Sequence, residues 1–550
     1  MATYTRANAW TNGGTFDNSD LLWYARAVGV MQSRQLDDPH SWWFFAAMHA
    51  EYVTPDSIAA ADPSSLLWKN IPAPPSVPVT PLPNRALSDE YWNQCQHQSW
   101  FFLPWHRGYL LALEAHIRAV VIAQNGPSTW ALPYWNYLGP GNEFNIPPAF
   151  AQTQMPDGSP NPLYVDARYG PDQNRIVYIP TRAVVQQRPP DPNFTQGAVT
   201  DDYMVNDLFT GSDLSTKLPG FGGPKTGFWP GGGTNGNLEG DPHNKVHVYV
   251  GKDLPGVGEG LMSDPGVAAL DPIFYLHHAN IDRMWAVWND TLSRQNPTDA
   301  AWVNGPTAAG DRKFIVPMPG GSPWTFTPQQ VNSLKQLNYT YDTLSAGPTV
   351  AVPPASLLTA RLGQLGATDL AEEMVKGARV TMGTKTELVG ASGNPLTLGR
   401  AGAATDVRLD SAVRDKISAS LASAEGLTNA EEITAPDRVY LNLENVRGTS
   451  DASVLSVYIN LPDEARPAEH PELFAGSVGL FGLRSASRKD SGHAGQGLTF
   501  LLDITPIVDR LHSKQAFDVN SLRVRIVPDK PIPDASKITI GRISVYREGL

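Results

Sequence analysis

Hydrophobic and polar positions divide the chain into a helical part and a strand-rich part. In residues 20–53, apolar side chains recur at helical spacing up to a break at residues 37–39, after which a second helix is predicted. A further helix is predicted after Pro104. Residues 140–236 lose this periodicity and are rich in Pro, Gly, Asp and Asn, which indicates loops laid over a helical scaffold. We therefore predict a mainly α-helical, loop-rich domain over residues 1–345.

The pattern changes after residue 436, where short β-branched segments alternate with turn-rich loops. Examples are RVYLNL, SVLSVYIN, LTFLLDI, SLRVRIV and KITIGRISVYR. They predict an all-β sandwich or jelly-roll-like domain over residues 437–550. The intervening residues 346–436 are rich in Ala, Gly, Ser and Thr and carry two weakly amphipathic patches, so we predict a linker with marginal helices there.

Composition indicates a folded protein of more than one domain. A chain of 550 residues exceeds what one core usually supports, which agrees with two domains. The net charge is -12 and no basic run occurs, so neither nucleic acid nor an anionic membrane is expected as a partner. The first residues lack a leader pattern and no stretch has the roughly 18 apolar residues of a membrane span, so we predict a cytoplasmic protein. Whether it forms a homo-oligomer stays open.

Histidine spacing indicates a metal site. His243 and His247 stand four residues apart, so on a helix they project from one face. A third imidazole from the helix that begins near Phe274 would complete a three-nitrogen site. Neutral imidazole is the commonest side-chain metal ligand. On spacing alone, surface histidines remain the alternative, because an isolated pair of this kind is a weak signal.

A second set of histidines strengthens the metal interpretation. His97 and His106 lie nine residues apart around an aromatic block, and the apolar stretch AAMHAEYV supplies His49. The chain offers no matching set of cysteine or carboxylate ligands. Two sets of three histidines therefore describe a pair of metals held by nitrogen, which suits copper.

The phrases FFLPWHRGYLLALE, DPHNKVHVYVG and DPIFYLHHANIDRMW resemble the two copper-binding signatures of the tyrosinase, catechol oxidase and polyphenol oxidase family, the type 3 dinuclear copper proteins. The resemblance covers roughly residues 1–345 in order. It implies two copper ions, dioxygen as a co-substrate and small phenols as substrates. By this resemblance the first copper would be bound by His49, His97 and His106, and the second by His243, His247 and His278, with His277 as a near neighbour.

Three further residues take roles from the same resemblance. A lone cysteine is usually a small buried hydrophobe, but fungal tyrosinases, which this stretch resembles, join such a cysteine to the histidine two residues on, so we predict a thioether between Cys95 and His97. Plant members share the LExxPHNxVH pattern, in which the glutamate and the asparagine hold a water that deprotonates phenols. This implies catalytic roles for Glu239 and Asn244. An ordinary carboxylate at a helix N-terminus is the alternative for Glu239.

The expected substrate pocket lies near the second set of histidines. Plant catechol oxidases place a bulky aromatic residue over the metal, upstream of the last ligand. At that place this chain has small residues: Pro265, Gly266 and Val267. They imply an open mouth and favour monophenols as substrates alongside catechols. Phe274, four residues before His278, is expected to pack against the ligands, and Asp282, four after, to accept from an imidazole or to form a salt bridge.

Together these features predict a tyrosinase, a polyphenol oxidase that ortho-hydroxylates monophenols and oxidises o-diphenols to o-quinones, the precursors of melanin. The alternatives are a catechol or o-aminophenol oxidase without monophenolase activity, a haemocyanin-like oxygen carrier and a zinc-binding structural protein. Residues 437–550 resemble the C-terminal domain of plant polyphenol oxidases, which caps the copper site of latent forms. That resemblance implies a lid over the active site.

Overall fold

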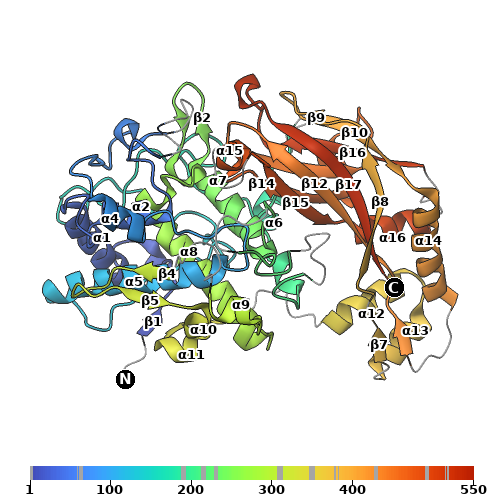
Figure 1. Ribbon diagram of the computed structural model, residues 1–550, viewed down its shortest axis with the longest axis horizontal. Coiled ribbons are helices and arrows are strands. Elements are labelled where there is room, and N and C mark those ends of the chain that lie inside the picture. The colour runs from blue at the N-terminus through green and yellow to red at the C-terminus, as the bar shows by residue number, and fades with distance from the viewer. Residues whose placement is uncertain are drawn as a thin grey trace.

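Helices and loops form one half of the molecule and a wide antiparallel sheet forms the other in this computed structural model (Figure 1). The chain begins in the helical part and ends in the sheet domain. The predicted fold class is confirmed. The structure describes residues 4–57, 60, 66–187, 194–211, 219–227, 233–305, 314–345, 354–376, 379–381, 383–426, 432–489, 495–514, 516 and 520–549.

The helical part starts where the apolar spacing predicts it. α1 (Ser19–Gln32) is capped by Asn18, and α2 (Trp42–His49) is capped by Ser41, whose side chains accept backbone N–H groups of the first turn. All eight residues of α2 are buried. The other helices of this part are α4 (Arg85–Tyr91), α5 (Phe102–Ala123), α6 (Arg182–Gln187), α7 (Lys245–Gly251), α8 (Ile273–Ala286), α9 (Ala300–Val303), α10 (Pro328–Val331) and α11 (Leu334–Leu337).

α5 and α8 contact each other in the centre of the helical part, and every residue of α8 is buried. A parallel pair of short strands, β1 (Tyr4–Arg6) and β6 (Tyr339–Tyr341), joins the two ends of this part. The remaining short pairs are β2 (Asp253–Leu254) with β3 (Gly258–Glu259), and β4 (Phe314–Val316) with β5 (Trp324–Phe326). The first and last strands of the predicted helical domain, residues 1–345, thus pair with each other.

The sheet domain is one antiparallel sheet in the order β14-β13-β16-β10-β8-β17-β12-β15, with β9 paired to β17. β14 and β15, at the two ends of this order, contact each other, so the sheet curls toward closure, as a jelly-roll-like domain does. The strands are β8 (Lys385–Ser392), β9 (Leu396–Thr397), β10 (Ala403–Leu409), β12 (Arg438–Arg447), β13 (Val454–Ile459), β14 (Phe474–Gly479), β15 (Leu498–Asp503), β16 (Ser521–Pro528) and β17 (Thr539–Gly549).

The prediction that residues 346–436 form a linker is wrong for much of their described length. β8 and β10 lie within this range and are interior strands, since β8 pairs with β10 and β17, and β10 also with β16. Their sequences, KTELVGAS and AATDVRL, carry few large apolar side chains, so their alternation is weak. The strands of the main sheet therefore begin at β8.

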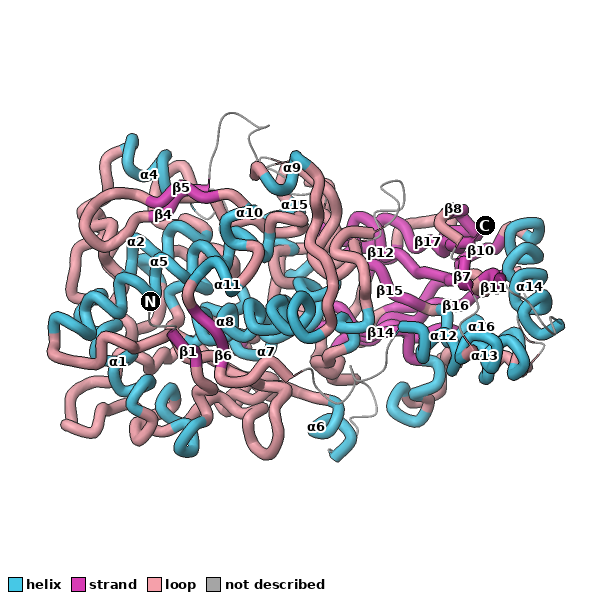
Figure 2. Tube along the Cα trace, turned by 90° about the horizontal axis from the view of Figure 1, so that it is seen from below, coloured by secondary structure: helices cyan, strands magenta, loops and turns pink. Residues whose placement is uncertain are grey.

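Helices and one short strand pair complete the sheet domain. Figure 2 shows α13, α14 and α16 gathered at the end of the molecule that lies away from α1. These elements are α12 (Pro354–Gln364), α13 (Thr368–Val375), α14 (Ser411–Gly426), α15 (Leu483–Ser487) and α16 (Thr505–Ser513), with β7 (Arg379–Thr381) parallel to β11 (Glu432–Thr434). Several of these elements lie within residues 346–436, so this range, which was expected to be a linker, is largely folded where the structure describes it.

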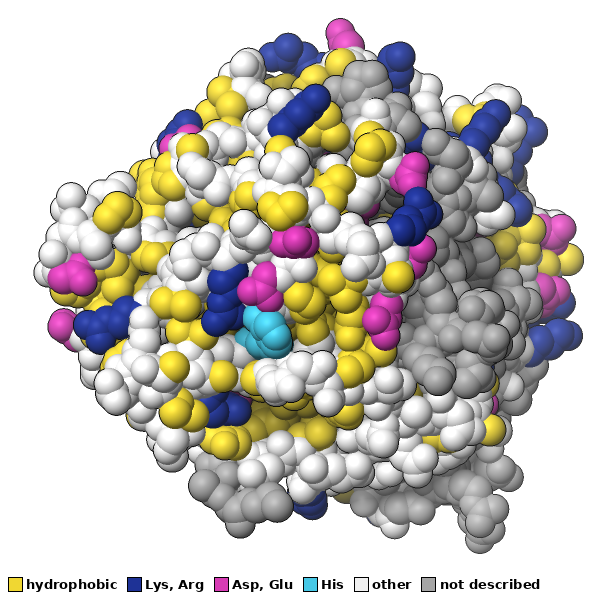
Figure 3. All heavy atoms as spheres, turned by 60° about the vertical axis from the view of Figure 1, so that its left-hand side comes forward, with side chains coloured by type: hydrophobic (Ala, Val, Ile, Leu, Met, Phe, Trp, Pro, Cys, Tyr) yellow, Lys and Arg dark blue, Asp and Glu magenta, His cyan; other side chains and the backbone are white. Residues whose placement is uncertain are grey.

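The surface carries both signs of charge. On the face of the helical part drawn in Figure 3, acidic and basic side chains are scattered among apolar and polar ones. Among the described residues, no helix combines the length and the apolar character that crossing a membrane requires.

Candidate metal centre

The first histidine cluster lies between α2 and α5. His49 is the last residue of α2, His97 lies in the loop before α5, and His106 is in the first turns of α5. One ring nitrogen from each histidine and the sulfur of Cys95 all lie within 4.8 Å of one another. The fold thus brings together the three residues expected to bind the first metal.

The second cluster is built by α7, α8 and the π-helical turn Glu239–Asn244 that leads into α7. His243 in this turn and His247 in α7 are separated by one helical turn, as their spacing predicts. α8 adds His277 and His278. One nitrogen from each of these four residues lies within 4.8 Å of the others.

The two clusters face each other. The rings of His106 and His278 stack with their centroids 4.5 Å apart and 14° between their planes. The rings of His97 and His243 lie 5.8 Å apart across the same space. His277 packs against Tyr137, with 5.6 Å between the ring centroids. His278, rather than His277, is therefore the α8 imidazole that stacks on the first cluster.

Hydrogen bonds orient several of these rings. Nδ1 of His49, His106 and His247 each lies within hydrogen-bond distance of a backbone carbonyl. The carbonyls belong to Pro265 at 3.0 Å, Phe102 at 2.8 Å and Met262 at 2.8 Å, respectively. Such a bond fixes the tautomer and leaves Nε2 with its lone pair for a metal. Nε2 of His49 and of His243 is buried without a hydrogen-bond partner, so nitrogen-ligated metal ions fit this site.

Burial keeps the imidazoles neutral. It lowers the pKa of His49 to about 4 and that of His243 to about 3. Burial also lowers the pKa values of His106, His247 and His278 well below the usual value. Because the neutral ring is the form that ligates metals, these side chains are ready to bind at neutral pH.

Cys95 lies inside the first cluster. Its Sγ is 3.4 Å from Nδ1 of His97 and 3.4 Å from Nε2 of His106. The thiol is buried, and burial raises its pKa well above the usual value, which favours the neutral S–H form. The sulfur thus contacts the ring to which the thioether was predicted.

Glu239 and Asn244 both lie at the second cluster. The buried carboxylate of Glu239 accepts the backbone N–H of Gln98 at 2.9 and 3.0 Å, and burial raises its pKa to about 8. Oδ1 of Asn244 lies 2.8 Å from Nδ1 of His243 and accepts its proton. This contact gives Asn244 a role in orienting a ring, which its sequence pattern did not indicate.

A side chain from the sheet domain packs on the histidine rings. Phe481 lies between β14 and α15 and is 3% exposed. Its ring stacks on His247 with 4.1 Å between centroids and 20° between planes. The same ring lies 5.7 Å from that of His243 and 6.0 Å from that of His97. Phe481 therefore contacts both clusters.

The open mouth expected at Pro265, Gly266 and Val267 is not found. Val267 is buried, and Gly266 packs so closely on Tyr52 that an added Cβ would lie 2.1 Å from the tyrosine ring. A Cβ added at Gly482 of the sheet domain would lie 3.9 Å from Pro265. The space beside these small side chains is thus occupied by other residues of the protein and not by solvent.

Phe274 packs as predicted, and Asp282 takes the second of its two expected roles. The ring of Phe274 lies 4.1 Å from that of His278. The carboxylate of Asp282 pairs with Arg107 and, at 3.1 Å, with Arg6. Burial alone raises the pKa of this carboxyl, but both guanidinium groups oppose it and hold the pKa below its usual value. Two hydroxyl groups also donate to this carboxylate, those of Tyr339 and Tyr341.

Buried ion pairs join the sheet domain to the helical part close to Phe481. Arg484 pairs with Asp264 at 2.8 Å and with Glu259 at 2.8 Å, both in the helical part. A second buried pair joins Lys252 to Asp529. Removing one partner of such a pair leaves an uncompensated buried charge. These contacts hold the two parts of the molecule together at the site.

Phe481 was not identified from the sequence, although a local signal exists. It stands in GLFG, a lone aromatic residue in a glycine-rich turn between a strand and a helix. A Cβ added at Gly479 would lie 3.1 Å from the backbone of Asn244 and Lys245, and Gly482 has φ +83°. Glycine is therefore required where the sheet domain approaches the second cluster. The docking itself depends on packing between domains, which no local pattern reports.

Sequence comparison relates both parts of the chain to known families. Residues 39–291 match the common central domain of tyrosinase, and residues 385–548 match a domain of unknown function, DUF7868. A tyrosinase of Hahella sp. (strain CCB-MM4), HcTyr1, is 31% identical over 539 residues, 96% of this chain and 97% of that protein. A latent polyphenol oxidase of Prunus armeniaca is 32% identical over 221 residues, 38% of this chain and 32% of that protein.

A solved structure shows the same fold. Latent apple tyrosinase aligns over 100% of this chain and 98% of its own, with a TM-score of 0.56 and 20% identity. At this identity the likeness concerns the fold alone. It includes both the helical part and the sheet domain, because the alignment covers the whole chain.

The predicted cytoplasmic location is wrong on this comparison. The relative from Prunus armeniaca is named as a chloroplastic protein, and so are a larreatricin hydroxylase of Larrea tridentata and a polyphenol oxidase of Malus domestica. A targeting segment is separate from the folded domains that it delivers. The composition and hydrophobic pattern of those domains therefore do not report the compartment.

Proposed function

Because the chain belongs to the tyrosinase family of two-copper oxidoreductases, we propose that it ortho-hydroxylates monophenols and oxidises o-diphenols to o-quinones with dioxygen. The observation that carries this proposal is the pair of facing, neutral histidine clusters with a buried carboxylate beside them. The carboxylate favours hydroxylation, since monophenols must lose a proton to react. Small phenols are the proposed substrates.

The proposed ligands come from both clusters. One copper would be held by His49, His97 and His106, and the other by His243, His247 and His278. When bound, the copper ions supply the redox chemistry by which dioxygen is reduced. The protein contributes neutral rings of fixed orientation, because backbone carbonyls hold several of the outer nitrogens.

We assign the role of general base to Glu239, acting through a water. A phenol has a pKa of about 10, and burial raises the pKa of the Glu239 carboxyl to about 8, so the ionised form of this carboxyl is a stronger base toward a phenol than an ordinary carboxylate. The backbone N–H of Gln98 holds the carboxylate in place. Asn244 supports this role by orienting His243.

The position of Phe481 indicates where a substrate ring would lie. An aromatic ring stacked on His247 occupies the mouth of the site. A phenol would stack in the same place, beside a histidine whose ring also has an edge contact with Phe274, 5.7 Å away between centroids. Substrate and Phe481 thus compete for one space, and we propose that the sheet domain is a lid over the active site.

We propose a thioether between Cys95 and His97, supported by their contact. Forming it removes the S–H hydrogen and one ring C–H hydrogen, makes an S–C bond and passes two electrons to dioxygen. Intact mass after copper loading tests this. A mass lower by two hydrogen atoms is expected, and an unshifted mass with a Cys95 that alkylates after unfolding rules the cross-link out. Cys95→Ala is the control that cannot shift.

The test of the proposed activity compares a monophenol with its matching o-diphenol. Copper-loaded protein with a protease site engineered between residues 345 and 354 is assayed before and after cleavage. Turnover of both substrates, faster after cleavage, is expected. Turnover of the diphenol alone makes the protein a catechol oxidase. Oxygen binding without turnover of either substrate makes it an oxygen carrier. The uncut engineered protein is the control.

A further inference from the structure

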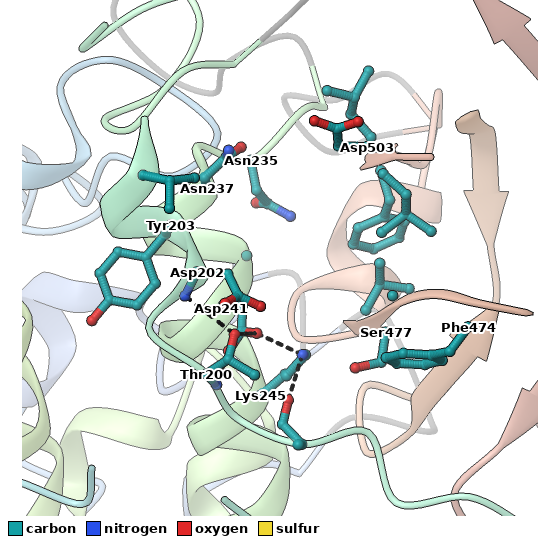
Figure 4. A pocket seen from close by; sticks show the side chains of 18 of the residues that line it. Thr200, Asp202, Tyr203, Asn235, Asn237, Asp241, Lys245, Phe474, Ser477 and Asp503 are labelled. Carbon is teal, nitrogen blue, oxygen red and sulfur yellow. Dashed lines mark hydrogen bonds and ion pairs between the residues drawn. The ribbon is translucent and has the colours of Figure 1, made fainter. Parts of the chain in front are cut away.

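A cavity lies between the helical part and the sheet domain (Figure 4). Its volume is about 990 Å³. One wall comes from residues 200–208 and from the π-helical turn Glu239–Asn244, and the other from the edge strands β14 and β15. Neither the six proposed copper ligands nor Phe481 line it. It is therefore distinct from the metal centre.

Apolar side chains are exposed on both walls of this cleft. Val205 and Leu208 face it from the helical part, and Leu208 is 52% exposed. Phe474, 36% exposed, faces it from β14, and the buried side chains of Phe500 and Leu502 line it from β15. Pockets that bind small molecules occur preferentially between domains and have mostly apolar walls of this kind. The cleft thus suits a ligand with a large apolar surface.

Polar atoms without hydrogen-bond partners also lie in the cleft. Nδ2 of Asn235 and Oγ of Ser477 lack a partner, although these residues are only 7% and 9% exposed. In Figure 4, Asn235 and Ser477 stand on opposite walls. Buried polar groups are normally hydrogen-bonded, so these donors indicate a ligand with acceptor oxygens.

The charges in the cleft select against an anion. Its cationic side chains are paired within the protein: Lys245 with Asp241, Arg182 with Asp202, and Arg438 with Asp503. Asp207 and Glu548 add two further acidic side chains to the lining. The lining is net negative, and an anionic ligand would meet like charge. A neutral ligand avoids this cost.

We propose that this cleft binds a neutral aromatic molecule with carbonyl or ether oxygens, and that binding favours the position of Phe481 over the copper site. The second half of this statement rests on the proposed lid. The π-helical turn in one wall carries His243, and β14 in the other wall leads directly to Phe481. A ligand that contacts both walls loses contacts when they separate. It therefore stabilises the arrangement in which they are close.

Binding is tested on the full copper-loaded chain with dimethoxyflavone, a neutral aromatic ketone. This probe has no phenolic hydroxyl and cannot be oxidised as a substrate. Saturable binding of one probe per chain is expected in calorimetry. Phe474→Ala and Asn235→Asp, which replaces a donor by an acceptor, are each expected to weaken binding about tenfold or more.

The matched control for the loss of an exposed side chain is Leu388→Ala, since Leu388 is 40% exposed on the same domain but outside the cleft. Its affinity for the probe is expected to equal that of the parent. Variants are compared only where their unfolding midpoints match the parent's, and Asn235→Asp, which keeps the side-chain volume, covers the case in which Phe474→Ala fails to fold. Absence of saturable binding, or equal affinity in Asn235→Asp, overturns the site.

The link to Phe481 is tested by hydrogen exchange, which does not depend on activity. Saturating probe is expected to slow amide exchange severalfold in the segment that contains Phe481, and to leave exchange in α1 unchanged. Probe binding without slower exchange there overturns the link while leaving the site. Because neither measurement requires turnover, failure of the proposed phenol oxidation would be recognised separately.

Discussion

The replacement Phe481→Ala tests the proposed lid most directly. The ring is 3% exposed and stacks on His247 at 4.1 Å, so closing the lid buries nearly all of it. Burying a phenylalanine side chain is worth about 1.5–3 kcal/mol, and an aromatic pair adds about 0.5–1.5 kcal/mol. The closed form should therefore lose about 2–4.5 kcal/mol, which shifts the equilibrium toward the open form by about 30-fold to 1,600-fold.

The assay is diphenol oxidation by uncut, copper-loaded protein. Phe481→Ala is expected to raise this basal rate at least tenfold (about 1.4 kcal/mol), up to a ceiling set by the cleaved parent. Ile543→Ala removes a buried side chain from the sheet core, away from the site. It is expected to lower the unfolding midpoint of the sheet domain without a matching rise in basal rate. If Phe481→Ala keeps the parent's basal rate while cleavage still activates it, Phe481 is not the covering side chain.

Four further predictions concern charged and polar groups around the site. Glu239→Gln and Asn244→Leu are expected to lower the ratio of monophenol to diphenol turnover about 100-fold, the usual contribution of a general base, and an unchanged ratio in both would remove that role. Asp282→Ala leaves two buried guanidinium groups without their carboxylate and is expected to lower the free energy of unfolding by about 3–5 kcal/mol in chemical denaturation. The pKa of Asp282 is held below its usual value in the folded protein, so its ionised carboxylate stabilises the fold fully above about pH 4. This contribution to the free energy of unfolding is lost as the pH falls through the pKa of the folded state. In Asp282→Asn, the decrease of stability with falling pH should therefore be less steep than in the parent. Arg484→Met leaves the interdomain carboxylates without their cation and should raise the basal diphenol rate before cleavage, whereas Arg523→Met, which breaks an exposed pair, should not.

The histidine clusters could be predicted because their chemistry is local. A spacing of four residues on a helix places His243 and His247 on one face whatever the rest of the fold does, and the helix of α8 does the same for Phe274 and His278. Each element thus carries its own part of the site. Only the facing of the two clusters required the tertiary structure.

Features that depend on distant partners could not be predicted. β8 and β10 are interior strands because β17 and β16 pair with them from more than a hundred residues away, and their own side chains are mostly small or polar. The small residues of segment 265–267 were wrongly taken to imply an open mouth, because the side chains that pack on them come from distant parts of the chain. Nothing in that segment reports that Tyr52 packs on Gly266, or that Gly482, far along the chain, lies beside Pro265.

The lid and the metal use different parts of the same imidazole. Phe481 lies on the face of His247, while Nδ1 of that ring bonds to the carbonyl of Met262 and Nε2 points toward His278, 3.4 Å away. Stacking on the face leaves both nitrogens as they are. Closing the proposed lid therefore would not compete with metal binding, and it would displace an aromatic substrate, because both need the same ring face. We therefore expect the closed protein to take up copper and to turn over phenols only after the sheet domain moves.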